Sequence, residues 1–591
     1  MPDGAIAAVA APASIEELRS QIQAIADREH IAGVAFALVD REGPTYVGGI
    51  GERDRDSHAP MTGDTAFRVG SLSKSIVALA VMRLVDQGKL DVDRPLRELV
   101  PDLEIDNPWE AEAPVTLAQC LEHTAGFDDF RFNEIYAATE DLPLRDALAI
   151  NPRSRVIRWK PGTRSSYSNV GYSVAARAVE VASGEPFDVY IQREILAPLG
   201  ITDADFQRSG DLSARLATGY METGPVAYHP FAHRPSASLL ASAADLAKVV
   251  HFFAMRGEGF PPIVSKAGIA RIERSGTLPY GHLDTEYGFA NYGDVRHPVL
   301  GRGHDGGMPG FHSAIRYFPS LGQGYVMMLN SNYTFRGYFE IRALLFAYLT
   351  RGQRFPKPLP ATPTEPPAAS YYRDAAPHNE VFAFMDRVRS GFFVEDFGYY
   401  AHMRDFYGWH TDLVPAVGGG YRRTDEYGSS VEFARAGDGT PILVMSGSYT
   451  EAMNPWLARL QLVALGFAVT LVKLAPIWGA IALAWRRKLR VVMWPAIAGL
   501  ALWPIDFLLR ESFMAGVIGQ VHPYTVALCA CTIVFPIASF ATLISTVRWC
   551  FRKDRPHALA LVPPMIFGLA FTGFALWLIA NHAFAFRTWA W

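Results

Sequence analysis

The sequence predicts an α+β main domain, followed by a small β-rich connector and an all-α four-helix transmembrane region. Three observations predict this order: mixed helix and strand patterns, then a proline-rich stretch, then four long apolar stretches. A chain of 591 residues is long enough for several domains. We place the main domain at residues 15–353 and the linker at residues 354–370. The connector follows at residues 371–455 and the transmembrane domain at residues 456–591.

Strand patterns lie at both ends of the main domain. A predicted helix over residues 14–28 precedes strand candidates at residues 34–39 and 45–51, and later strand candidates fall near residues 313–318 and 324–329. Apolar residues at helical spacing indicate the helix, and short apolar runs bounded by turn residues indicate the strands. These elements favour an α+β fold.

Ser71 and Lys74 place a hydroxyl and an amine three residues apart, directly before the apolar residues 76–85. At the start of a helix, this spacing puts both side chains on one face. A serine needs a neighbouring base or cation to become a nucleophile, and a desolvated Lys74 can be either. The N–H groups at the helix start also favour a developing anion. The pair therefore predicts an activated serine, although a bare Ser-x-x-Lys match is often accidental.

Tyr167 and Asn169 form a second motif, in a turn-rich stretch before the apolar residues 170–181. A tyrosine near an ammonium group can ionise below its usual pKa of about 10 and take the serine proton. On its own, this motif more often marks a turn.

His304, Asp305, Gly306 and Gly307 form the third motif. Glycines here let a strand backbone approach a ligand closely, and one N–H could complete an oxyanion hole with that of Ser71. Alone, the motif is more often a hairpin. The three motifs in this order predict an acylation site.

In these motifs the chain resembles the superfamily of serine β-lactamases and penicillin-binding proteins. It resembles in particular the class C-like branch, which includes D-alanyl-D-alanine carboxypeptidases, D-amino-acid peptidases and esterases. Framework stretches accompany the motifs at residues 31–34, 88–93, 121–126, 198–201 and 242–245. The resemblance implies a β-lactamase-like fold: an antiparallel sheet flanked by helices plus a helical subdomain, with the two ends of the domain paired in one sheet.

The resemblance also implies roles for the motif residues. Ser71 would be acylated, Lys74 and Tyr167 would share its proton, and Asn169 would hold the substrate amide. Gly307 would donate the second oxyanion N–H, next to Gly306 on the substrate-binding strand.

His304 stands where many members of the superfamily carry a lysine. A permanent cation favours a substrate carboxylate, whereas a histidine is charged only part of the time near neutral pH. The substitution favours peptidase or esterase activity over strict recognition of β-lactam carboxylates. His123 lies in a framework stretch, where we expect a structural role.

A linker and a connector follow the main domain. Residues 355–367 hold six prolines, which is typical of a semi-rigid linker. A helical stretch over residues 380–388 and a hairpin pattern at residues 431–434 and 442–445 come next. These patterns predict a small β-rich connector that packs on its neighbours.

Four apolar stretches occupy the tail, at residues 460–484, 491–509, 525–547 and 558–580. Each is near the roughly 20 residues that a helix needs to cross a membrane. Their internal prolines are tolerated in membrane bundles, and tryptophans near their ends suit the interface. The tail therefore predicts a lipid bilayer as a partner.

Basic residues in the short loops predict the orientation. They cluster in the first and third loops between the apolar stretches: Arg486, Arg487, Lys488, Arg490, Arg548, Arg552, Lys553 and Arg555. The positive-inside rule places both loops in the cytoplasm. The main domain then faces the periplasm or exterior of a bacterial-type inner membrane.

An exported domain should follow a signal peptide. Residues 1–14 resemble the small-residue end of one, but they lack a basic start and a full apolar core. We expect that the native start lies upstream or that the signal has been removed.

Lys473 and Asp506 are charged residues within the first two predicted spans. Their depths are similar if the helices are antiparallel, so we expect a structural ion pair, with a substrate or proton path as the alternative.

Composition narrows the range of partners. The net charge is −4 and no basic block lies outside the tail, which argues against nucleic acid. Neither zinc-ligand spacing nor a phosphate-binding glycine loop occurs, so we expect no metal and no cofactor. Cys120 is the only cysteine outside the tail, so the main domain cannot form an internal disulfide.

Together these observations predict a membrane-anchored serine hydrolase that forms an acyl-enzyme on Ser71. We expect a peptidase or amidase acting on D-amino-acid-containing or linear peptides. A class C-like β-lactamase and a carboxylesterase remain alternatives. A non-hydrolysing penicillin-binding sensor is an alternative from another class, although the cytoplasmic loops are too short for an output domain. A transporter with an attached enzyme domain is weaker, because four helices make a small pathway.

Overall fold

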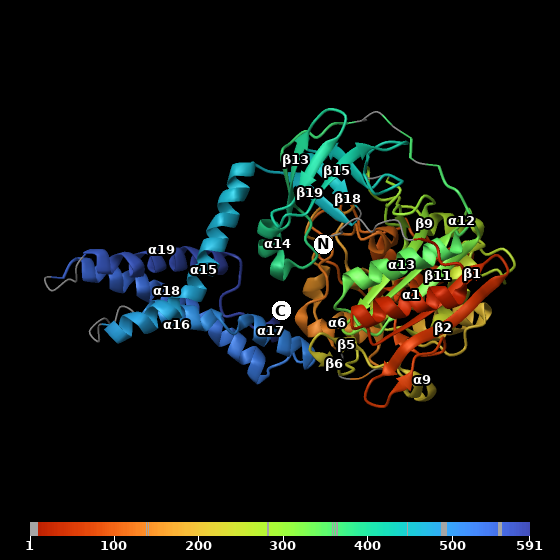
Figure 1. Ribbon diagram of the computed structural model, residues 1–591, viewed down its shortest axis with the longest axis horizontal. Coiled ribbons are helices and arrows are strands. Elements are labelled where there is room, and N and C mark those ends of the chain that lie inside the picture. Colours follow the sequence, from red (N-terminus) through yellow and green to blue (C-terminus); the bar gives the residue numbers. More distant parts are fainter. Residues whose placement is uncertain are drawn as a thin grey trace. The chain divides into compact units, whose positions relative to one another are not determined.

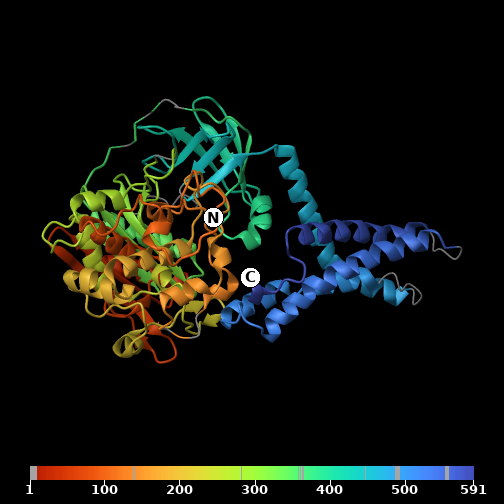
Figure 2. The same cartoon turned by 180° about the vertical axis from the view of Figure 1, so that it is seen from behind.

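The computed structural model describes residues 10–136, 139, 141–280, 283–356, 358–359, 361, 365–445, 447–485, 493–552 and 558–591. The chain folds into two compact units (Figures 1 and 2). Unit 1 comprises Met1–Phe130, Ala137–Asn379 and Ser390–Ala452, and unit 2 comprises Arg131–Tyr136, Glu380–Arg389 and Met453–Trp591. The predicted signal-like residues 1–9 and loop residues Arg486, Arg487, Lys488, Arg490, Lys553 and Arg555 lie outside the described residues.

A seven-stranded antiparallel sheet forms the centre of the main domain, in the order β3-β2-β1-β11-β10-β9-β8. The first and last long strands pair at its middle, with Val34 opposite Leu329. This pairing confirms the topology that the resemblance implied. The strands are β1 (Gly33–Asp40), β2 (Gly43–Asp54), β3 (Ala59–Pro60), β8 (Tyr292–Asp294), β9 (Gly301–Met308), β10 (Phe311–Phe318) and β11 (Gln323–Leu329).

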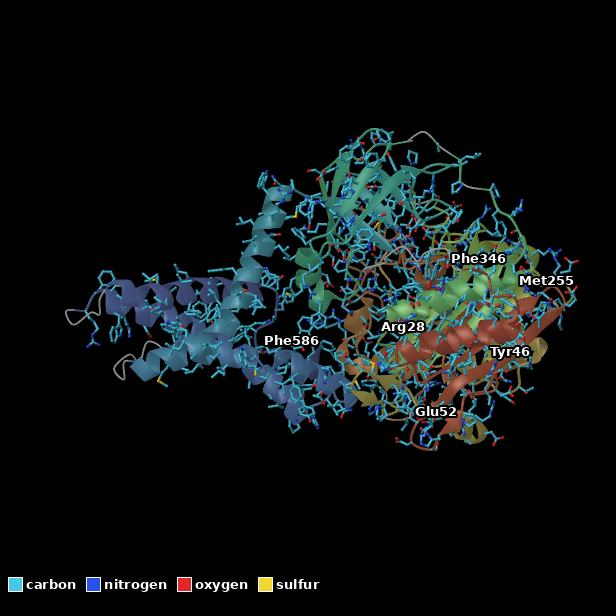
Figure 3. The ribbon with its side chains drawn as sticks, viewed as in Figure 1. Arg28, Tyr46, Glu52, Met255, Phe346 and Phe586 are labelled. Atoms are coloured by element: carbon cyan, nitrogen blue, oxygen red, sulfur yellow. The ribbon has the colours of Figure 1, made fainter. Side chains whose placement is uncertain are left out.

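Helices cover both faces of this sheet. On one face, α1 (Ile15–Arg28) and α13 (Phe335–Leu349) pack on alternate residues of β1, among them Phe36. Phe346 of α13 belongs to this core and Tyr46 of β2 packs against it (Figure 3). The intervening residues of β1 are also buried, and α11 (Ala243–Ala254) packs on the same strands. Alternate side chains of a strand point to opposite faces, so the sheet is buried on both sides.

The helical subdomain lies between the early and late strands of the sheet. Its centre is α2 (Ser73–Asp86) packed on α7 (Asn169–Ser183), and α2 is preceded by the 3-10 turn η1 (Gly70–Leu72). Shorter helices surround this pair: α3 (Leu96–Leu99), α4 (Leu117–Leu121), α6 (Leu144–Ala149), α8 (Phe187–Ile191), α9 (Gly210–Arg215), α10 (Arg234–Ala237) and α12 (Lys266–Ile272). Two small two-stranded sheets pair β4 (Phe67–Arg68) with β7 (Leu240–Ala241) and β5 (Tyr220–Met221) with β6 (Gly224–Pro225).

The connector is a closed eight-stranded antiparallel barrel, which is more than the predicted hairpin. The predicted hairpin strands are β17 and β18, and closure comes from β12 pairing with β19. Its interior is filled by apolar side chains such as Tyr372, Leu413 and Phe433, and its outer face packs on Trp159 and Tyr280 of the main domain. The strands are β12 (Tyr371–Asp374), β13 (Gly391–Asp396), β14 (Ala401–Arg404), β15 (His410–Pro415), β16 (Tyr421–Arg423), β17 (Val431–Arg435), β18 (Pro441–Met445) and β19 (Ser448–Ala452).

Among the described residues of unit 2, three helices are long and apolar enough to cross a membrane: Pro455–Ile481, Pro523–Cys550 and Leu561–Ala580. They lie in α15 (Pro455–Trp485), α18 (Pro523–Cys550) and α19 (Ala558–Ala580). The prediction of four full spans is therefore corrected. The second stretch forms two short helices, α16 (Met493–Leu502) and α17 (Ile505–Met514), which meet at Pro504. A proline has no N–H to donate and its ring obstructs the preceding turn, which favours such a break.

Lys473 and Asp506 do not form the expected ion pair. Within the described part of unit 2 both side chains are exposed and no contact joins them. The expectation assumed one continuous second helix, whereas Asp506 lies in α17, beyond the break at Pro504.

Two short segments from earlier in the chain also belong to unit 2. They are α5 (Phe132–Ile135) and α14 (Ala383–Arg389), the latter preceded by a 3-10 turn at Glu380–Phe382. Phe132 packs edge-on against Phe382, Phe513 and Phe586. The membrane-type helices therefore carry an aromatic cluster built partly from the main-domain and connector sequences.

Candidate active site

Ser71 lies in the 3-10 turn η1, immediately before α2. Gly70 has a φ of +59°, a conformation that a side chain would strain, and it makes the turn that places Ser71 at the helix start. Ser71 is partly exposed, although nearly every residue around it is buried. Its hydroxyl is therefore reachable from solvent and held by a rigid support.

Lys74 is fully buried, one helical turn beyond Ser71. Its Nζ donates to Ser71 Oγ at 3.0 Å, to Asn169 Oδ1 at 2.7 Å and to the Ser236 carbonyl at 2.7 Å. Burial lowers the pKa of Lys74 to about 7, and the charge of Asp129 opposes that shift. A large fraction of Lys74 is therefore neutral near pH 7 and able to accept a proton.

Tyr167 donates its hydroxyl to Ser71 Oγ at 2.8 Å. Desolvation raises the pKa of Tyr167 above its ordinary value. This differs from the expectation that a nearby ammonium group lowers it. The loss of water around the phenol is the largest cause of the raised pKa, and the negative charge of Asp129 raises it further. Tyr167 therefore stays protonated as a hydrogen-bond donor in the resting site.

Two histidine rings lie against Tyr167. His123 is buried, with its ring centroid 4.1 Å from that of Tyr167, and its Nδ1 accepts the Ser168 N–H at 3.1 Å. Burial lowers the pKa of His123, so the ring is neutral. His378, from the segment after β12, stacks on Tyr167 with centroids 5.8 Å apart. The barrel thus contributes an exposed side chain to the border of the site.

Asn169 is the first residue of α7, and Ser168 caps that helix by accepting the Gly171 N–H. Its Oδ1 faces Lys74, and its Nδ2 donates to both carboxylate oxygens of Asp129 at 3.0 and 3.1 Å. Both ends of the amide are therefore engaged inside the protein.

The strand β9 passes very close to the turn that carries Ser71. A Cβ added to Gly306 would lie 1.9 Å from the Val69 carbonyl oxygen, and one added to Gly70 would lie 2.7 Å from the Gly307 nitrogen. These contacts explain why glycines stand at these positions, as the motif indicated. They bring the Gly307 backbone beside Ser71.

His304 lies on the same strand but is only 3% exposed. Its Nδ1 donates to the Asp305 carbonyl at 2.5 Å, so its Nε2 accepts the hydroxyl proton of Tyr287 at 2.8 Å. Burial lowers the pKa of His304 to about 3. The ring is therefore neutral across the physiological range and cannot act as the cation that a lysine would supply.

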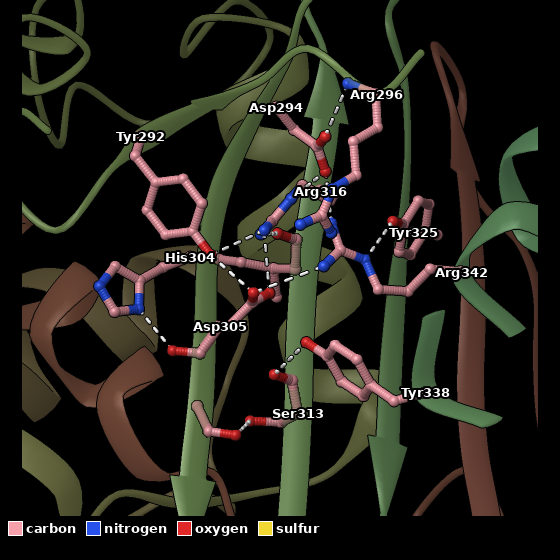
Figure 4. Close-up of polar contacts among 12 residues, drawn as sticks. Tyr292, Asp294, Arg296, His304, Asp305, Ser313, Arg316, Tyr325, Tyr338 and Arg342 are labelled. Carbon is pink, nitrogen blue, oxygen red and sulfur yellow. Dashed lines mark hydrogen bonds and ion pairs between the residues drawn. The ribbon is translucent and has the colours of Figure 1, made fainter. Parts of the chain in front are cut away.

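A buried ionic cluster anchors β9 from the side opposite His304 (Figure 4). Asp305 contacts Arg316 at 2.9 Å and accepts a hydrogen bond from the Tyr292 hydroxyl at 2.6 Å. It also lies 3.4 Å from Arg342. Both arginines contact a second carboxylate, that of Asp294. Burial alone would raise the pKa of Asp305, but the two arginines lower it overall. The cluster fixes the strand that holds His304, Gly306 and Gly307.

The structure thus brings together all seven residues that the sequence selected. Four further groups were not predicted: the Ser236 carbonyl, Asp129, Tyr287 and His378. A backbone carbonyl leaves no sequence signal, and the other three approach the site from segments far away in the chain. Only the adjacent pair of carboxylates at Asp128 and Asp129 could have drawn attention as an unusual buried feature.

Comparison with known proteins identifies the family. The family model described as Beta-lactamase matches residues 18–349, which is more than half of the chain. The chain therefore belongs to the beta-lactamase family of serine hydrolases, which confirms the resemblance drawn from its motifs.

Individual relatives are distant. Penicillin-binding protein 4 of Amycolatopsis lactamdurans is 28% identical over 372 residues, covering 59% of this chain and 93% of that protein. Esterase EstB of Burkholderia gladioli is 30% identical over 195 residues, covering 31% of this chain and 49% of EstB, so the match spans about half of EstB's length. Among solved structures, the octameric penicillin-binding protein homologue from Pyrococcus abyssi is 22% identical with a TM-score of 0.49, covering 74% of this chain and 100% of that one.

Proposed function

We propose that the protein is a membrane-anchored serine hydrolase that forms an acyl-enzyme on Ser71 and acts as a peptidase or amidase. The observation that carries this proposal is the pair of hydrogen bonds that Ser71 Oγ receives from Lys74 and Tyr167. One partner has a pKa near 7 and the other keeps its proton, so a base and an acid flank one nucleophile.

In the first step, Ser71 Oγ attacks the substrate carbonyl carbon while its proton moves to the neutral amine of Lys74. The N–H groups of Ser71 and Gly307 stabilise the oxyanion. The proton then reaches the leaving nitrogen through the Tyr167 hydroxyl, the C–N bond breaks and the amine departs. A water molecule attacks the acyl-serine, with the proton transfers reversed, to release the acid and restore Ser71.

The neutral state of His304 narrows the substrate class. Without a fixed positive charge at this position, the site attracts a substrate carboxylate close to the scissile bond less strongly. We therefore favour internal amide bonds of D-amino-acid-containing or linear peptides over β-lactams. Similarity to both a penicillin-binding protein and an esterase keeps the β-lactamase and carboxylesterase alternatives as outcomes of the test.

The apolar helices α15, α18 and α19 support membrane anchoring. Placing the first basic loop, which follows α15, in the cytoplasm puts the part of the chain before α15, and with it Ser71, on the outer side of a bacterial-type inner membrane. Substrates would then be extracellular or periplasmic amides and esters.

The test is a substrate screen on the full-length detergent-solubilised protein with Ser71→Ala as control. Acyl-D-amino-acid peptides, linear peptides, nitrocefin and short esters are compared by kcat/KM. We expect turnover of peptides or amides that is lost in Ser71→Ala. Faster nitrocefin or ester turnover would replace the peptidase assignment, and a stable penicillin adduct without turnover of any substrate would support the sensor instead.

A further inference from the structure

Asp129 is a buried carboxylate whose oxygens accept hydrogen bonds from N–H groups. It is 6% exposed. Its Oδ1 accepts the N–H groups of Phe130 at 2.9 Å and of Asn169 at 2.9 Å, and both oxygens accept from Asn169 Nδ2. An ionised carboxylate is acceptor-only, whereas a protonated one would carry an O–H donor, so this set of partners fits the charged form.

The contact with Asp129 settles which way the Asn169 amide points. With Nδ2 on the carboxylate, Oδ1 must face Lys74, where it accepts at 2.7 Å. The reverse orientation would place an oxygen against the carboxylate and an NH₂ against Lys74 Nζ, and both contacts would be unfavourable. The geometry therefore has one stable amide orientation.

The same contact leaves one amide hydrogen available. The two N–H bonds of an asparagine side chain diverge by about 120°, too widely for both to reach the oxygens of a single carboxylate. One N–H is shared between Oδ1 and Oδ2 of Asp129, and the other points elsewhere. Fixing the first N–H fixes the direction of the second.

We propose that Asp129 is a positioning residue of the acylation site. It holds Asn169 so that the amide oxygen of Asn169 orients Lys74 and the second amide N–H of Asn169 points toward the carbonyl group of the substrate. This inference rests on the proposed function of Ser71. Asp129 acts through Asn169, which itself contacts Lys74.

Asp129 also acts on Lys74 through its charge. The groups that face Lys74 are the rings of Tyr167 and Tyr172, at 4.9 and 5.6 Å, together with the carboxylate of Asp129 and the imidazole rings of His123 and His304. Both histidines are neutral because burial lowers their pKa values. Asp129 is therefore the anionic group that favours the protonated form of Lys74, and its removal should let Lys74 lose its proton at lower pH.

The test measures the rate at which a fluorophosphonate probe acylates Ser71 as a function of pH, in the full-length solubilised protein. In Asp129→Asn the carboxylate is lost, so we expect the acid limb of the profile to shift down by about one pH unit. We also expect the plateau rate to fall on the order of tenfold, because Asn169 loses its fixed orientation. A lower plateau with an unmoved acid limb would overturn the electrostatic part of the proposal.

Asp129→Glu separates charge from geometry. It keeps the negative charge but moves the carboxylate by one methylene, so the acid limb should stay near that of the wild type while the plateau falls. A shifted acid limb in this variant would contradict the assignment.

Glu122→Gln is the matched control for burial. Glu122 is a 1% exposed carboxylate that pairs with Arg271 at 2.6 Å and accepts N–H bonds from Gly276 and Thr277. Its removal should lower the thermal midpoint and leave the pH profile in place. If it moves the profile as Asp129→Asn does, the shift reflects general destabilisation and the proposal fails.

A double-mutant cycle covers the case in which Asp129→Asn folds poorly. If Asp129 sets the plateau through Asn169, adding Asp129→Asn to Asn169→Ala should lower the plateau no further. Additive losses would contradict the proposal. Labelling that survives in Ser71→Ala would instead sink the proposed function, so the two failures are distinguishable.

Discussion

Lys74 Nζ lies 3.0 Å from Ser71 Oγ and is completely enclosed by protein. The short distance couples the amine to the Ser71 hydroxyl, and the enclosure brings the pKa of Lys74 down to about 7. A surface lysine at the same distance would stay protonated at neutral pH and could not take a proton. The depth of Lys74 is therefore as important as its spacing from Ser71.

The first prediction concerns pH. Only neutral Lys74 can accept the Ser71 proton, so acylation should fall about tenfold for each pH unit below 7 and level off above it. Stopped-flow labelling with a fluorophosphonate checks this profile. A rate that stays level down to pH 5 would show that Lys74 is not the base.

The second prediction concerns Tyr167, whose hydroxyl is proposed to deliver the proton to the leaving group. Tyr167→Phe should slow amide hydrolysis by about a hundredfold or more, because an amine departs only when protonated. Fluorophosphonate labelling expels fluoride and needs no such proton, so its rate should fall much less. Equal losses with both reagents would assign Tyr167 to activation of Ser71 instead.

The third prediction concerns the close approach of β9. Gly306→Ala would place a methyl group 1.9 Å from the Val69 carbonyl and 2.5 Å from Ser313 Oγ, so the strand must move away from the Ser71 turn. We expect at least a tenfold loss of labelling rate. Gly437→Ala is the control, since nothing lies within 4 Å of its added Cβ. A fully active Gly306→Ala protein would contradict the described backbone contact.

The fourth prediction concerns the cluster behind β9. Asp305→Asn removes one of the two carboxylates that face the buried Arg316 and Arg342. Because the Asp305 side chain is 35% exposed and Asp294 still contacts both arginines, we expect a cost of about 1–3 kcal/mol. The thermal midpoint of the solubilised protein should therefore drop by several degrees. Lys266→Met breaks an ion pair with Glu258 in which both side chains are 70% exposed, and it should change the midpoint very little. Similar effects of the two variants would refute the structural role of the cluster.

The Ser71–Lys74 pair can be recognised from the sequence because its signal is local. Ser71 and Lys74 are three residues apart at a helix start, so helix geometry alone puts them on one face. The strand glycines Gly306 and Gly307 were also recognisable from their type and order. The pairing of the first and last strands was implied by family resemblance rather than by the pattern itself.

Other features depend on contacts between distant segments. The neutral state of His304 follows from burial and from Tyr287, neither of which is visible in a motif. Asp129 meets Asn169 from forty residues away, and the barrel closes through a pairing of β12 with β19 that no hairpin pattern reveals. The break at Pro504 turned one predicted span into two short helices, although prolines elsewhere lie inside long helices of the same unit.

Locating the covalent adduct tests most directly whether Ser71 is the residue that becomes acylated. The full-length protein is treated with a fluorophosphonate, digested and analysed by mass spectrometry, beside the Ser71→Ala variant. We expect one adduct, on Ser71, formed at a rate that rises through pH 7 and absent from Ser71→Ala. An adduct on another residue, or undiminished labelling of the Ser71→Ala protein, would contradict it.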